Sequence, residues 1–264
     1  MRFVDYSLLQ ILAASILVLA GAIETGRWFG IRARRESPAT ITTLEGAILG
    51  LLALMIGFTF AVALSRYEAR RQGVLNEANA IGTTALRARL LPEPHGQECL
   101  KLLRQYVKLR LDIAERVLSP SELEAAVGQS NALQEALWLQ VKAVAAKDNG
   151  MVPTGLFIQS LNEMIDDQEK RLMALTSSVP NIVLTVLYGV AIFAGAFAGY
   201  AAGMDKQPSR APTYVAIAIF TAVILLIQDL DRPNTGFITV SQKPMRDVAA
   251  SLTSYGETST KPLP

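Results

Sequence analysis

The 264-residue chain contains one cysteine and one histidine. Cys99 has no partner for an intrachain disulfide, so the chain has no disulfide framework. His95 has no cysteine partner, which excludes the usual zinc-binding spacings. His95 follows Pro94 at an expected helix start, where it reads most simply as a solvated turn residue, and Cys99 is expected to pack within the next helix. The sequence therefore predicts neither a metal site nor a bound cofactor.

Signatures of catalysis and of nucleic-acid binding are also missing. A Ser-His-Asp arrangement has no histidine to use beyond His95, and no glycine-rich phosphate-binding loop is present. The basic residues are dispersed and matched by acidic ones, with a formal net charge of +2, so no nucleic-acid partner is expected. No segment alternates apolar and polar residues as a half-buried strand does. These absences predict an all-helical protein that is not an enzyme.

Four long charge-free segments stand out in a chain that is 51% hydrophobic, which is high for a globular domain. They cover residues 6–23, 46–65, 172–204 and 211–228, and Pro180 interrupts the third. A membrane-spanning helix needs about 20 mostly apolar residues, and a chain in hydrocarbon must satisfy its backbone internally. The sequence therefore predicts an all-α integral membrane protein with four transmembrane helices.

The first segment has one alternative interpretation, a cleaved secretory signal peptide. Ala20-Gly21-Ala22 offers the small residues of a cleavage site. Asp5 beside Arg2 is unusual in such a leader, and the four arginines in residues 27–35 suit the flank of a stop-transfer segment. A retained first span is therefore the expectation.

Residues 66–176 are polar and charge-balanced, with 14 Lys/Arg and 14 Asp/Glu. They are too polar for lipid and too periodic for disorder. Within residues 99–118, apolar side chains recur every three or four positions, which indicates an amphipathic helix. Ser119, Pro120 and Glu122 form a helix-start signal for a second helix, and residues 153–178 read as a third that continues toward span 3.

The second span continues beyond any bilayer. Thr42 and Glu45 form a capping box at its start, and no proline follows until Pro92. A helix over residues 43–91 measures about 73 Å at 1.5 Å per residue, whereas the hydrocarbon core is only about 30 Å thick. The remainder is expected to project into water, where it presents Arg66, Glu68, Arg70, Arg71, Glu77, Arg87 and Arg89.

The predicted organisation has four parts: spans 1 and 2 in residues 1–65, a soluble helical domain in 66–176, spans 3 and 4 in 177–230, and a tail in 231–264. Four spans place both termini and the soluble domain on one side of the membrane. Eight basic residues near the span ends on that side, against six in the two opposite loops, do not decide the orientation.

Small residues form a stripe on each of two spans. In lipid, such stripes let helices approach closely, either within one subunit or between subunits. On span 2 the stripe consists of Gly46, Gly50, Ala53, Gly57 and Ala61, and on span 3 it consists of Ala191, Gly195, Gly199 and Gly203.

Leu54 and Phe58 lie four residues apart on another face of span 2. They could ring a pore if several subunits brought this span together, because an apolar constriction gates by dewetting. The simpler alternative is contact with lipid or with the core of one subunit.

Asp229 and Asp231 lie where span 4 meets the membrane boundary, next to Arg232. An ionisable group at this depth usually has a partner or a function. Two interpretations are open for these aspartates. The simpler one is a salt bridge from Asp229 to Arg66 or Arg70, followed by a turn at residues 233–236. In the second, the aspartates line an ion vestibule or hold a cation through their carboxylate oxygens.

The stretch GFTFAVALSRYEARR resembles the second-span motif of bestrophins, in which a Gly-Phe pair precedes a Ser/Thr-Arg-aromatic cluster. Gly57, Phe58, Ser65, Arg66 and Tyr67 occupy these positions. The longer string through residue 94 and the ending DLDRPNTGFITVSQKPM look like the bacterial bestrophin-like family of four-span proteins, which is remotely related to bestrophin ion channels. The resemblance covers spans 2 to 4 and most of the chain.

The resemblance implies a pentameric channel, mostly anion-selective in bestrophins, with span 2 lining the pore and a cytosolic helical domain. Carried over by position, the apolar neck is Gly50, Leu54 and Phe58, although bestrophins typically have a bulky residue where Gly50 stands. The exit or vestibule then consists of Ser65, Arg66, Tyr67 and Arg70. The acidic cluster after the last span is reduced to Asp229 and Asp231, so calcium gating is not expected.

We therefore expect a multi-pass homo-oligomer in the bacterial inner membrane that conducts inorganic ions. Anions are the expected permeant ions. Its expected partners are the lipid bilayer and further copies of itself. A different class of function remains open, a non-conducting membrane scaffold that binds a partner through residues 96–175. Under that alternative, changes at Leu54 and Phe58 leave function intact.

Overall fold

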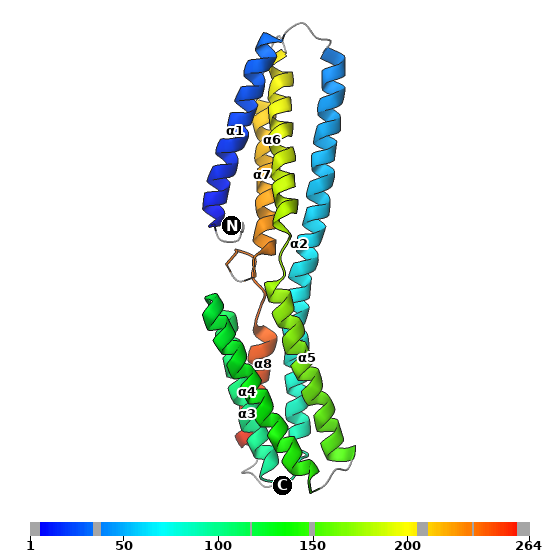
Figure 1. Cartoon of the computed structure of the whole chain (residues 1–264), viewed down its shortest axis with the longest axis vertical. Helices are drawn as coiled ribbons and strands as arrows, with labels where there is room; N and C mark the ends of the chain where they lie inside the picture. The colour runs from blue at the N-terminus through cyan, green and yellow to red at the C-terminus, as the bar shows by residue number, and fades with distance from the viewer. Residues whose placement is uncertain are drawn as a thin grey trace. The chain divides into compact units, whose positions relative to one another are not determined.

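All regular secondary structure in the described residues is helical. A computed structural model describes residues 6–33, 38–116, 118–147, 151–204, 211–233 and 235–257. The elements in chain order (Figure 1) are α1 (Leu8–Arg32), α2 (Pro38–Ala88), α3 (His95–Glu115), α4 (Pro120–Ala145), a π-helical turn (Met151–Gly155), α5 (Leu156–Thr176), α6 (Asn181–Met204), α7 (Ala211–Asp231) and α8 (Lys243–Glu257). Within these residues no strand is present, so the all-α prediction is confirmed.

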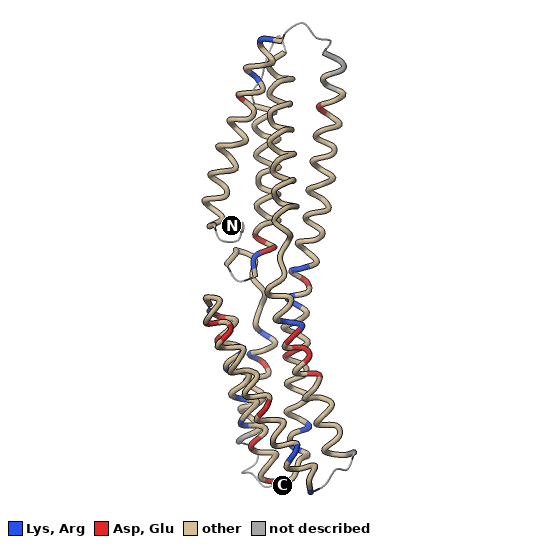
Figure 2. The backbone as a smooth tube through the Cα atoms, viewed as in Figure 1, with Lys and Arg blue, Asp and Glu red and all other residues tan. Residues whose placement is uncertain are grey.

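The chain divides into two compact units. The first, called the membrane unit here, contains Met1–Tyr67 and Ser178–Ile238; the second, called the polar unit, contains Glu68–Ser177 and Thr239–Pro264. Helix α2 contributes its first part to the membrane unit and its last part to the polar unit. Figure 2 shows charged residues concentrated on the helices of the polar unit, whereas α1, α6 and α7 carry few.

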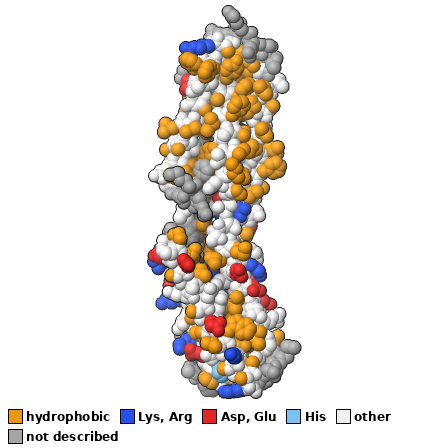
Figure 3. Space-filling model, in the orientation of Figure 1, with side chains coloured by type: hydrophobic (Ala, Val, Ile, Leu, Met, Phe, Trp, Pro, Cys, Tyr) orange, Lys and Arg blue, Asp and Glu red, His pale blue; other side chains and the backbone are white. Residues whose placement is uncertain are grey.

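Four helices are long and apolar enough to cross a membrane, as predicted. They are α1, the apolar part of α2, α6 and α7. Inside the membrane unit, Leu19, Leu52, Leu187 and Ile224 belong to one apolar core. Many other large apolar side chains of these helices stay exposed, and Figure 3 shows them gathered on the surface of this unit. An apolar exterior suits hydrocarbon rather than water.

Two predicted helix boundaries are wrong. Helix α2 begins at Pro38, so Thr42 lies inside the helix and not at its cap. Proline suits a first helical position because its fixed φ is helical and its missing N–H is not needed there. The expectation that the helix before span 3 runs on into it also fails, because α5 ends at Thr176 and α6 begins only at Asn181. Pro180 disfavours helical backbone at the residue before it.

The predicted start of α4 is confirmed. Ser119 Oγ accepts a hydrogen bond from the Glu122 N–H at 3.3 Å, and Glu122 Oε2 accepts from the Ser119 N–H at 2.8 Å. Pro120 occupies the first turn.

The polar unit buries its own apolar core, in which Ile81, Leu103, Phe157 and Met164 are fully enclosed.

Candidate functional site

Helix α2 presents two opposite faces within the membrane unit. Leu52, Ile56 and Ala63 are buried in the apolar core. Each residue advances the direction of its side chain by about 100°, so Gly50 and Leu54 lie on the far side of the helix from this buried stripe. Leu54 is 55% exposed and Phe58 is 67% exposed. The predicted neck residues thus share an outward-facing surface of α2.

The small residues of α2 also face outward. A Cβ placed on Gly46, Gly50 or Gly57 would meet no atom within 4 Å. The described residues of this chain therefore leave the α2 stripe uncovered, and it does not pack within the subunit.

The α6 stripe packs within the subunit, against α1. A Cβ on Gly199 would collide with the carbonyl group of Ile23, and one on Gly203 would lie 2.5 Å from the Arg27 carbonyl oxygen. On the α1 side, a Cβ on Gly26 would collide with the carbonyl oxygen of Ala196. Gly195 is more loosely enclosed, because a Cβ there would lie 3.2 Å from Ile217 Cδ1. The close backbone approach of α1 and α6 therefore depends on glycines contributed by both helices.

The predicted exit residues differ in their exposure. Ser65 is exposed, and Arg66 and Tyr67 are half-buried in the membrane unit. Arg70 belongs to the polar unit and is only 1% exposed. The expectation that Arg70 projects into water is therefore wrong.

Asp229 and Asp231 hold backbone segments at the end of α7. Asp229 accepts hydrogen bonds from the N–H groups of Phe237 at 2.7 Å and Ile238 at 2.9 Å. Asp231 accepts from the Val179 N–H at 2.8 and 3.0 Å. Backbone donors, and not the side chain of Arg66, thus occupy both oxygens of Asp229. These contacts tie the chain after α7, and the chain before α6, to the end of α7.

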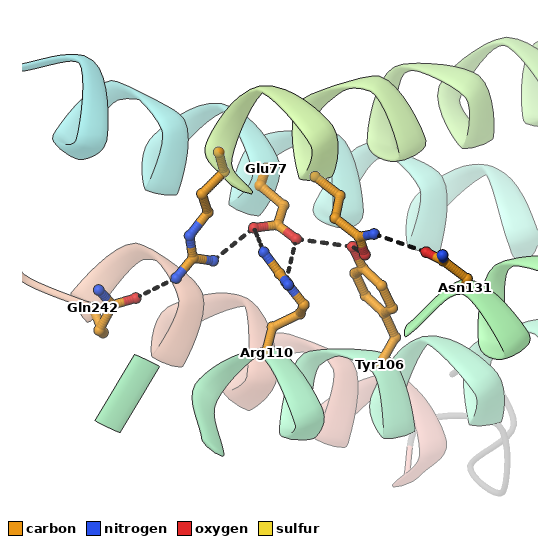
Figure 4. Close-up of polar contacts among 7 residues, drawn as sticks. Glu77, Tyr106, Arg110, Asn131 and Gln242 are labelled. Atoms are coloured by element: carbon orange, nitrogen blue, oxygen red, sulfur yellow. Dashed lines mark hydrogen bonds and ion pairs between the residues drawn. The ribbon is translucent and has the colours of Figure 1, made fainter. Parts of the chain in front are cut away.

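A buried network of charged and polar side chains centres on Glu77 in the polar unit (Figure 4). Arg110 Nε donates to Glu77 Oε1 at 2.7 Å, and Arg171 Nη1 donates to Glu77 Oε2 at 2.6 Å. The Tyr106 hydroxyl lies 2.8 Å from Glu77 Oε1. Arg171 Nη2 also donates to Gln242 Oε1 at 3.0 Å. One carboxylate on α2 thereby joins α3, α5 and the residue preceding α8.

Burial sets the electrostatics of this network. Glu77 is fully buried, and Arg110 and Arg171 are 1% and 2% exposed. Burial alone would lower the pKa of Arg110, but the adjacent Glu77 carboxylate outweighs it and raises that pKa. Burial, together with the Glu77 charge, raises the pKa of Tyr106 well above its usual value. At Arg171 burial outweighs the Glu77 carboxylate and lowers the pKa of the guanidinium. Arg110 therefore stays charged at neutral pH, and Tyr106 stays protonated.

This network was not predicted from the sequence. Glu77 and Arg70 were expected to project into water, whereas the structure buries both. A usable signal was present, because Glu77 lies in the helical register of Val74, Ile81 and Ala85, all of which are buried. A charged residue on the apolar face of an amphipathic helix indicates a buried partner.

The described residues show no cluster of three or more His, Cys, Asp or Glu side chains that could hold a metal ion. Cys99 is buried, and this burial, with a smaller effect of Glu98, raises the pKa of its thiol to about 12. His95 Nδ1 lies 2.8 Å from Gln140 Oε1, and this polar contact joins α3 to α4. The His95–Gln140 contact and the Glu77 network therefore both connect helices of the polar unit.

Together these features define an all-helical membrane protein, with four membrane-length helices and a polar helical unit formed by the chain between the second and the third of them and by the chain after the fourth. A family model described as Bestrophin-like domain matches residues 12–245. The chain belongs to the bestrophin-like family.

Solved structures of a bacterial bestrophin homologue from Klebsiella pneumoniae share this fold. One is 17% identical with a TM-score of 0.67, over 95% of this chain and 98% of that chain. A point-mutated form is 16% identical with a TM-score of 0.68, over 93% and 97% of the two chains. No curated protein sequence matches this chain.

Proposed function

We propose that this protein is a homo-oligomeric ion channel whose pore is lined by α2. The observation that carries the proposal is the outward-facing, charge-free surface of α2, on which Leu54 and Phe58 are more than half exposed. Glycines next to them leave room for a neighbouring helix to approach. Membership of the bestrophin-like family supports the same arrangement.

The pore wall would gate through its apolar side chains. A ring of Leu54 and a ring of Phe58 would form a constriction that excludes water when narrow. Gly50 supplies no side chain, so the neck has two bulky positions and a wide third one. Such a neck needs no metal, cofactor or catalytic group.

Anions are the proposed permeant ions. Arg66 follows the apolar part of α2, where a ring of positive side chains would raise the local anion concentration.

The bacterial inner membrane is the proposed location. The family resemblance supports a cytosolic polar unit and a pentamer.

Asp229 and Asp231 are proposed to stabilise the pore-exit end of α7 through their backbone contacts rather than to bind calcium.

Reconstitution of the purified protein in a planar bilayer tests this function. Phe58→Ala should change conductance or open probability, because it removes half of the bulky neck. Phe193→Ala is a matched control, since Phe193 on α6 is similarly exposed at 59% and lies outside the proposed pore. Absence of current from both the wild type and Phe58→Ala would contradict channel function.

A second candidate function is a non-conducting scaffold. Its supporting observation is the set of exposed apolar side chains in the polar unit, where Leu86, Leu90 and Leu139 are each about half exposed. A scaffold predicts that Leu139→Glu abolishes function in cells whereas Leu54→Ala and Phe58→Ala do not. The channel predicts the reverse order of severity.

A further inference from the structure

A cavity of about 160 Å³, partly open at the surface, lies among the helices of the membrane unit, toward the end where α2 and α7 begin. Side chains from α1, α2, α6 and α7 line it. On the α6 side the lining consists of Ala191, Ala194, Gly195 and Ala198, whose small side chains leave this space open. The opposite walls come from larger residues such as Leu49 and Phe220.

Glu45 is the one charged residue among those that line the cavity, and Thr213 is the one other polar residue. Glu45 shares a helix face with Leu49 and Leu52, which also line the space. Among the described residues, none forms a hydrogen bond or an ion pair with the Glu45 carboxylate. Within the part of the chain that the structure describes, its charge therefore has no counterpart, and the rest of the cavity lining is largely apolar.

Burying an ionised carboxylate without a partner costs free energy, because the charge loses its hydration. An ionisable group within a membrane-length helix therefore usually has a partner. One carboxylate and one hydroxyl are too few ligands for a bare metal cation, which takes six or more oxygens if it is calcium. An organic ammonium fits better, because it brings positive charge, N–H donors and an apolar body together. A cavity of about 150 Å³ with apolar walls holds a molecule the size of benzene.

We propose that this cavity binds a small organic ammonium compound. The ammonium group donates to the Glu45 carboxylate, with the Thr213 hydroxyl as a second contact, and a benzene-sized apolar body fills the space beside Ala194 and Phe220. The site lies on a different face of α2 from Leu54 and Phe58, and its occupancy does not depend on whether the protein conducts ions.

Phenethylammonium and its neutral analogue phenethyl alcohol are suitable probes, because they share the apolar body and differ in the charged group. Binding to the full chain in lipid nanodiscs is measured by calorimetry, with empty nanodiscs as the baseline for partition into lipid. The ammonium probe should bind wild type at least about tenfold more tightly than the alcohol, as a charge-assisted hydrogen bond predicts. This comparison needs no variant.

Three variants locate the site. Glu45→Gln should weaken binding of the ammonium probe about tenfold and leave binding of the alcohol unchanged. Ala216→Phe, which fills the cavity from α7, should abolish binding of both probes. Glu24→Gln is the matched control, because Glu24 lies in the same unit outside the cavity lining and contacts Tyr214; it should bind like wild type.

Equal binding of the two probes to wild type would overturn the proposal, as would wild-type affinity in Glu45→Gln or in Ala216→Phe. No saturable binding of the ammonium probe to wild type would overturn it as well. Native mass spectrometry that finds a lipid retained by wild type and lost from Ala216→Phe would assign the cavity to lipid instead.

Discussion

Arg171 on α5 donates to Glu77 on α2 at 2.6 Å, across 94 residues of sequence, with both side chains buried. Arg110 of α3 donates to the same carboxylate, so one acidic side chain compensates two buried guanidinium groups. Removing one partner of a buried ion pair leaves an uncompensated charge, whereas the intact pair contributes little net stability. The arrangement thus makes the polar unit depend strongly on Glu77.

Glu77→Gln should lower the free energy of unfolding of the polar unit by about 3–5 kcal/mol, because both arginines then lose their buried counter-charge. Glu68→Gln is the matched control on the same helix. Glu68 pairs with Arg71 at the surface, at 3.3 Å, and should contribute less than about 1 kcal/mol. Denaturant unfolding of the detergent-solubilised chain measures both, and equal effects of the two substitutions would contradict the structural role of Glu77.

Gly26→Ala should separate α1 from α6, because the added methyl group would collide with the Ala196 carbonyl oxygen. We expect a loss of about 1–3 kcal/mol, the usual range for overpacking. Gly21→Ala, five residues earlier on α1, meets nothing within 4 Å and should be neutral or slightly stabilising. Thermal unfolding in detergent compares the two variants. A stable Gly26→Ala protein would show that α1 and α6 do not pack through their glycines.

Cys99 should be unreactive in the native protein. Its pKa of about 12 leaves only about one thiol in ten thousand ionised at pH 8, and the thiolate is the reactive form. Unfolding returns the pKa to its usual range near 8.5 and exposes the thiol. Maleimide labelling followed by mass spectrometry should therefore detect modification only after denaturation. Rapid labelling of the native protein would contradict the burial of this residue.

Local signals in the sequence were sufficient for most of the fold. The four apolar segments predicted the membrane-length helices, and Ser119 with Glu122 predicted the start of α4, because each signal lies within a few residues of the structure that it specifies. The start of α2 was misplaced because two helix-start signals, Pro38 and Thr42, compete four residues apart.

The candidate sites were less predictable because their partners are distant in sequence. Burial of Glu77 depends on Arg110 and Arg171, which lie 33 and 94 residues away. The two glycine stripes look alike as patterns, but only that on α6 meets a complementary surface, on α1, among the described residues. Which side chains of α2 would face another copy of the chain in the proposed oligomer depends on the assembly and not on helical periodicity alone.

The proposed position of α2 around a central pore is tested most directly by a structure of the purified protein in lipid nanodiscs. The channel proposal predicts a ring of identical subunits in which Leu54 and Phe58 of every copy face a common central axis. Glycines of the α2 stripe should contact the neighbouring α2. A monomer, or an oligomer in which Leu54 and Phe58 face lipid, would contradict it.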